Sequence, residues 1–94
     1  MSTIKKVLGK WKTVKQSVPK EQVIAVLKKY FPGKYKLKGG SHIIVRHPSL
    51  RGLPGFAEGR FLIVVEGGQK VKRWYLKNLV MAIEYLMEIG EIKE

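Results

Sequence analysis

The residues best suited to chemistry lie at positions 39–42, Gly-Gly-Ser-His, between a basic segment and an apolar one. An imidazole exchanges protons near neutral pH, so His42 could act in general acid–base catalysis. The glycine pair permits a tight turn and the close approach of another backbone. Lys36 and Lys38 precede the turn, and Arg46 follows it. This setting suits proton transfer on a phosphodiester, although a lone histidine at the start of a strand is usually just a polar residue that fits its turn.

The charge balance favours a polyanionic partner. The chain has 19 Lys and Arg residues against seven Glu and no Asp, giving a formal net charge of +12. All but one of these cations precede residue 78, whereas four of the acids follow it. Nucleic acid is a better match to such a field than an anionic membrane surface is. The alternative is a lysine-rich surface that is merely well solvated.

The composition also excludes several classes of protein. Without Cys there is neither a disulfide framework nor a thiolate metal site. Without Asp, a two-metal nuclease or a glycosidase carboxylate pair is not expected. No signal peptide is visible, and the longest apolar runs, residues 61–65 and 79–83, are far too short to span a bilayer. We therefore expect a cytoplasmic protein without metal, cofactor or membrane contact.

The N-terminal residues differ from the rest of the chain. Residues 1–18 form a basic extension with five lysines and no acid. Apolar residues recur there at spacings of three and four, which fits an amphipathic helix, but a basic arm that becomes ordered on a partner fits equally well. A single domain is expected over residues 19–94. Its first helix is predicted to begin near Pro19 with Ser17 as the cap, and to end at Pro32-Gly33.

Three strands and a second helix complete the predicted domain. The strands are expected at residues 35–38, 41–46 and 60–66. Gly39-Gly40 turns between the first two, and a loop over residues 48–59 leads to the third. After Gly67-Gly68, apolar residues at helical spacing over 76–87 predict a core-facing helix. The fold class is therefore α+β, helix–strand–strand–strand–helix, with both helices on one face of a three-stranded antiparallel sheet.

The third predicted strand has a continuous apolar centre, Phe61-Leu62-Ile63-Val64-Val65. Apolar residues on both faces indicate either a central strand or a strand whose second face meets a partner.

The order of these elements, with Gly40-Ser41-His42 at the first hairpin, resembles the HicA toxins of bacterial and archaeal toxin–antitoxin modules. The resemblance covers about residues 21–86. Its further motifs are Arg46-His47-Pro48, Val65-x-Gly67 and Leu76-Lys77-x-Leu79. The resemblance implies a fold like that of double-stranded-RNA-binding domains and metal-independent cleavage of mRNA, with His42 as the catalytic residue. It further implies a HicB-type antitoxin that covers this site.

Three features depart from the family pattern. Val64 and Glu66 stand where the family often has Pro and His in the third strand. Trp74-Tyr75 replaces the Gly-Thr or similar pair that opens the last helix, and residues 1–18 have no counterpart. If the third-strand His binds RNA or takes a proton, its replacement by a carboxylate weakens activity. A non-catalytic RNA-binding module on the same fold is therefore the alternative, and a DNA-compacting or ribosome-associated basic protein is a third.

Cleavage of RNA without a metal usually proceeds by attack of the 2′-OH on its own phosphate. It needs a base, an acid and cations near the phosphoryl oxygens. His42 can serve as base or acid, and Lys38 and Arg46 are near enough along the hairpin to bind the phosphate. His47, at the far end of the strand, is expected to be a turn residue. The predicted RNA-binding residues are Lys36, Lys38, Gly39, Gly40, Ser41, Arg46, Lys72 and Arg73.

Aromatic side chains could add base stacking in single-stranded RNA. Most aromatics in so small a domain belong to its core. Trp74 and Tyr75, beside Lys72 and Arg73, are the two that we expect to be exposed.

Overall fold

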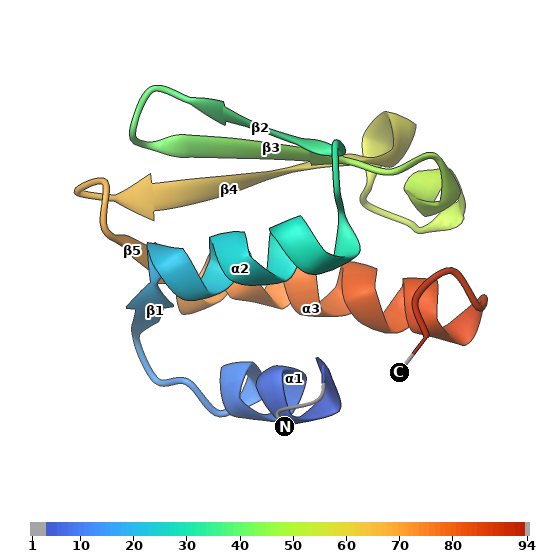
Figure 1. Cartoon of the computed structure of the whole chain (residues 1–94), viewed down its shortest axis with the longest axis horizontal. Helices are drawn as coiled ribbons and strands as arrows, with labels where there is room; N and C mark the ends of the chain where they lie inside the picture. The colour runs from blue at the N-terminus through green and yellow to red at the C-terminus, as the bar shows by residue number, and fades with distance from the viewer. Residues whose placement is uncertain (1–3, 94) are drawn as a thin grey trace.

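A computed structural model describes residues 4–93 and has an α+β architecture (Figure 1). The helices are α1 (Ile4–Lys12), α2 (Lys20–Tyr30) and α3 (Arg73–Glu88). The strands are β1 (Ser17–Pro19), β2 (Tyr35–Lys38), β3 (His42–Arg46), β4 (Arg60–Glu66) and β5 (Lys70–Lys72). They form one antiparallel sheet in the order β1-β5-β4-β3-β2. The predicted fold class is confirmed, but the sheet has five strands where three were expected.

Helices α2 and α3 lie on the same side of the sheet, as expected, and α1 lies beyond them (Figure 1). Helix α3 buries an apolar stripe at helical spacing against β4 and β5. That stripe consists of Leu76, Leu79, Val80, Ala82, Ile83 and Leu86. The sheet contributes the alternate residues of its central strands, Ile43, Val45, Ile63 and Val65, which are almost fully buried. The core therefore lies between the sheet and the helices, and no helix of the described residues lies on the other face of the sheet (Figure 1).

The two additional strands are the short outer pair, β1 and β5. Val18 lies opposite Val71 and Ser17 opposite Lys72, so the segment before α2 is hydrogen-bonded to the segment before α3. This pairing corrects the predicted cap of α2. Ser17 belongs to β1, the residue before the helix is Pro19, and no side chain caps the helix there. A strand of three residues is too short to show a periodicity, so only its pairing reveals it.

The basic N-terminal extension contributes to the core. Over Ile4–Lys12 the helical alternative is the observed one, and Ile4, Leu8 and Trp11 are buried. Helix α1 packs on α3, and an ion pair joins Lys12 to Glu84 across the contact. Residues 1–3 of the extension lie outside the described part of the chain.

The loop between β3 and β4 is more ordered than its Gly and Pro content suggested. It contains two 3-10 turns, Pro48–Gly52 and Ala57–Gly59, and buries Leu50 and Phe56. The Gly59 carbonyl accepts a hydrogen bond from the His47 amide at 3.0 Å, which joins the two ends of the loop. Gly59 has a φ of +74°, a value that favours glycine.

Candidate nucleic-acid interface

The helix-free side of the sheet, which we call the open face, carries the polar residues of the central strands. Along β4, burial alternates strictly enough to assign each side chain to a face. Phe61, Ile63 and Val65 point to the helices, so the outward positions are Arg60, Leu62, Val64 and Glu66. Strand β4 is thus a central strand, which is one of the two explanations that the sequence allowed for its continuous apolar centre. No helix among residues 4–93 covers its second face (Figure 1).

His42 lies on this open face at the start of β3. It is directly opposite Lys38 of β2 and Val64 of β4. Directly opposite residues point to the same face with Cβ atoms about 4.5–5.5 Å apart. The imidazole is exposed, and the Ser41 hydroxyl lies 2.7 Å from its Nδ1 atom. This contact orients the ring and leaves Nε2 for a ligand.

The length of the β2–β3 turn determines which face His42 occupies. A two-residue turn at Gly39-Gly40 would pair Lys38 with Ser41 and place His42 opposite Leu37, on the helical side. The observed pairing of Lys38 with His42 makes a three-residue loop, in which Gly39 has a φ of +59°. The predicted strand over residues 41–46 therefore begins one residue later, at His42. That shift turns the imidazole to the open face.

A basic hollow of about 390 Å³ begins at Lys38, the residue opposite His42, and extends over β2, β3 and β4 toward Arg46. Its lining residues are Gly33, Lys34, Tyr35, Lys36, Lys38, Ile44, Arg46, Pro48 and Arg60. They include five cations and no carboxylate. Glu58 lies near its edge, with one carboxylate oxygen 3.0 Å from Arg60 and 4.0 Å from Arg46. All three side chains are exposed, so these ion pairs are weak and a phosphate could replace them.

Two of the hollow's cations were not among the predicted binding residues. Arg60 is directly opposite Arg46, and Lys34 accepts a backbone hydrogen bond from Arg46 through its carbonyl oxygen. Arg60 was recognisable in principle, because counting along Arg60–Glu66 places it on the same face as Leu62 and Val64. Lys34 belongs to no strand, and only the folded chain places it here.

The glycine turns at the end of the sheet lie next to each other. A Cβ added to Gly68, in the β4–β5 turn, would lie 3.5 Å from the Gly40 carbonyl oxygen of the β2–β3 turn. The predicted residues Gly39, Gly40 and Ser41 are thus at an exposed corner beside His42.

Lys72 is on the open face as well, but beyond β4 and already paired. Its Nζ is 2.8 Å from a Glu66 carboxylate oxygen, and this hydrogen bond and charge raise the pKa of Lys72. Lys70 lies opposite Glu66 from the same strand. Arg73 is exposed as the first residue of α3. Of the predicted binding residues, the structure places Lys38 directly opposite His42 and Lys36 two residues away on β2. Arg46 is at the other end of β3, about 13 Å along the strand from His42, so it is too far away to bind the same phosphate as expected. Lys72 and Arg73 lie apart from both.

His47 has a structural position. It is 7% exposed, and its ring meets Phe31 edge-on at 6.0 Å between centroids. Its Nδ1 accepts a hydrogen bond from the Ser49 amide at 3.1 Å and so caps the first 3-10 turn. Burial, and then the charge of Lys34, lower the pKa of His47. The interpretation of His47 as a turn residue agrees with these contacts.

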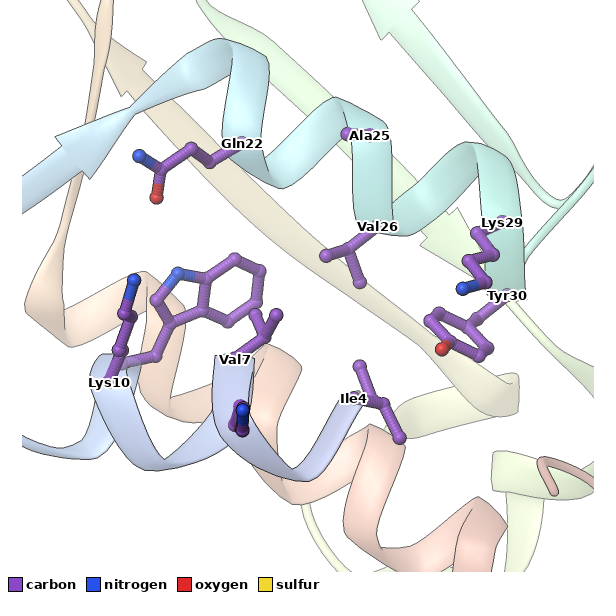
Figure 2. A pocket seen from close by; sticks show the side chains of 10 residues that line it. Ile4, Val7, Lys10, Gln22, Ala25, Val26, Lys29 and Tyr30 are labelled. Atoms are coloured by element: carbon purple, nitrogen blue, oxygen red, sulfur yellow. The ribbon is translucent and has the colours of Figure 1, made fainter. Parts of the chain in front are cut away.

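A second hollow lies among the helices, away from the open face (Figure 2). Ile4 and Val7 of α1 face Val26 of α2 across it, with Tyr30 at one end (Figure 2). Its lining includes Lys6, Lys10 and Lys29, but it lies between α1 and α2, so these lysines cannot contact a phosphate bound at His42 on the open face.

Two further properties bear on function. Within residues 4–93, no helix combines the length and apolar character needed to cross a membrane. The same residues contain no group of three or more His or Glu side chains arranged to hold a metal ion.

Comparisons with models of protein families, with curated proteins and with solved structures find no significant match to this chain.

Proposed function

We propose that this protein is a metal-independent endoribonuclease in which His42 transfers the proton. The observation that carries the proposal is the exposed imidazole on an open sheet face, oriented by Ser41 and flanked by the basic hollow. The other histidine, His47, is buried, so of the two only His42 presents its ring to a ligand.

The proposed reaction forms a bond between the 2′ oxygen and phosphorus and breaks the bond to the 5′ oxygen. His42 takes the proton from the 2′-OH, and the departing 5′ oxygen gains a proton from the imidazolium or from water. Lys38 is directly opposite His42, and the other cations of the hollow extend from there toward Arg46. Lys38 stabilises the negative charge that develops on the phosphoryl oxygens at His42, and the more distant cations bind neighbouring phosphates of the strand.

We further propose that the activity is that of a toxin, an mRNA interferase of a type II toxin–antitoxin module. The resemblance to the HicA family supports this, and so does the open face. An apolar strip of the exposed Leu62 and the half-buried Ile44 and Val64, between cations, suits a protein that covers the site in the resting cell. The proposed partners are therefore mRNA and a HicB-type antitoxin.

One observation favours a non-catalytic RNA-binding module as the second candidate. The residue opposite His42 on β4 is Val64, and Glu66 is engaged with Lys72. On β4, therefore, the side chain directly opposite the imidazole cannot act as a second acid or base. A single imidazole can still move both protons, but with a smaller rate gain than a pair of groups gives.

The test is RNA cleavage in EDTA by the wild type, by His42→Ala and by Gln69→Ala. Gln69 is an exposed polar turn residue and controls for surface substitution. We expect cleavage by the wild type and Gln69→Ala, and a loss of about 10²-fold or more in His42→Ala with RNA affinity retained. Equal RNA binding without cleavage by any of the three would support the binding module instead.

A further inference from the structure

Trp74 is the most exposed large apolar side chain of the described residues. It is 71% exposed, in contrast to Trp11, which is 3% exposed in the core. Trp74 lies in the first turn of α3 and lines a hollow of about 340 Å³ with Val64, Glu66, Lys72 and Tyr75. We call this the Trp74 hollow.

The Trp74 hollow adjoins His42. Val64 lines it and is also the residue directly opposite His42 in the sheet. Neighbouring strands are about 4.8 Å apart, so the hollow begins one strand from the imidazole, on the side away from Lys38. A ligand group in the basic hollow and another in the Trp74 hollow would therefore lie on either side of His42.

The two hollows differ in charge. The basic hollow has five cations and no carboxylate in its lining. In the Trp74 hollow the charge of Glu66 offsets that of Lys72, and the remaining lining is aromatic or aliphatic. A phosphate is attracted to the first. The second offers no net charge to an anion, but it does offer an aromatic ring to a flat, uncharged group.

We propose that the Trp74 hollow binds one unpaired nucleobase of the RNA strand whose phosphate lies at His42. The proposal rests on the proposed function for the identity of the ligand, and adds that the substrate is single-stranded. A base stacks on an indole only when its own face is free, as in single-stranded RNA and not within a duplex.

The fluorescence of Trp74 tests this directly, because the other tryptophan is buried. The probes are 2′-O-methyl RNA oligonucleotides, which lack the 2′-OH and cannot be cleaved by the proposed route. The first is a single strand, and the second is a series of the same strand in which one nucleotide, at a different position in each member, lacks its base. The third is the duplex of the same sequence. The proteins are the wild type, Trp74→Ala, Trp74→Phe and Met81→Ala. Met81 is an exposed apolar residue of α3 that does not line the hollow, and serves as the matched control.

We expect the single strand to quench the tryptophan emission, with the quenching lost at one abasic position. Trp74→Ala should bind the single strand about fivefold or more weakly, whereas Trp74→Phe and Met81→Ala keep most of the affinity. Equal affinity of Trp74→Ala and wild type, or equal quenching by duplex and single strand, would overturn the proposal.

Because these probes cannot be cut, the result does not depend on catalysis. Stacking without cleavage of ordinary RNA would refute the nuclease and keep the base-binding site. Cleavage of ordinary RNA, with no effect of the Trp74 substitutions on binding, would support the nuclease and refute the base-binding site.

Discussion

The distribution of lysines predicts that RNA binding depends on which face a charge occupies, and not only on the net charge. Lys36 and Lys38 both lie on the open face and line the basic hollow. Within residues 4–93 neither forms an ion pair, whereas Arg46 and Arg60 are near Glu58. The double variant Lys36→Gln/Lys38→Gln therefore removes two cations that are free to contact phosphates.

The expected effect follows from counterion release. Each phosphate contact on a single strand contributes about 0.7 to the slope of log affinity against log salt. Losing two contacts should lower the magnitude of the slope by about 1.4, and should weaken binding about tenfold near 0.15 M salt. Fluorescence anisotropy of a labelled 2′-O-methyl oligonucleotide, titrated at several salt concentrations, measures both quantities.

The matched control is Lys5→Gln/Lys10→Gln. It removes the same charge from exposed positions of α1, on the far side of α2 and α3 from the sheet (Figure 1). Its slope should stay close to that of the wild type. If both double variants lower the slope equally, the charge acts diffusely and the assignment of the open face is wrong.

Three predictions concern the scaffold, and equilibrium unfolding in urea measures each. Gly59→Ala should lower the free energy of unfolding more than Gly67→Ala does. Both glycines have positive φ, which costs alanine about 1–2 kcal/mol, but only at Gly59 would the new Cβ overlap the His47 carbonyl oxygen, which adds about 1–3 kcal/mol. Equal losses for the two variants would contradict this packing. Leu8→Ala should cost about 2–5 kcal/mol, since Leu8 is buried, and a negligible cost would mean that α1 is a loose arm. Stability should fall as the pH drops below 6.5, the ordinary pKa of His, because the folded state holds His47 neutral while the unfolded chain takes up a proton. His47→Gln should show a smaller fall, and an identical fall would exclude His47 as its source.

The elements with a long apolar pattern were predictable from the sequence. The strands at Tyr35–Lys38 and Arg60–Glu66 have the predicted bounds, and α3 buries its predicted stripe. Each has enough residues for its period to be read, and each meets the core that the pattern requires. The pairing of β1 with β5 was not predictable, because a three-residue strand with one buried valine has no period.

The candidate site likewise has residues whose position was predictable from the sequence and residues whose position was not. Lys36 and Lys38 could be placed on one face by alternation alone. The face of the sheet on which His42 lies could not be predicted, because Ile43-Ile44-Val45 is apolar throughout and shows no alternation. A one-residue difference in the length of the preceding turn moves His42 to the opposite face. The approach of Trp74 to Val64 depends on β5 bringing the start of α3 beside the sheet, and β5 is visible only in the fold.

If His42 promotes attack by the 2′-OH, the chemistry of the product ends will show it. An RNA oligonucleotide is incubated in EDTA with the wild type or His42→Ala, and mass spectrometry identifies the new ends. A second substrate carries a single 2′-deoxy nucleotide at the cleavage position. We expect 2′,3′-cyclic phosphate and 5′-hydroxyl ends with the wild type only, and no cleavage at the deoxy position. The same ends from His42→Ala, cleavage at the deoxy position, or no product from a folded, RNA-binding wild type would contradict it.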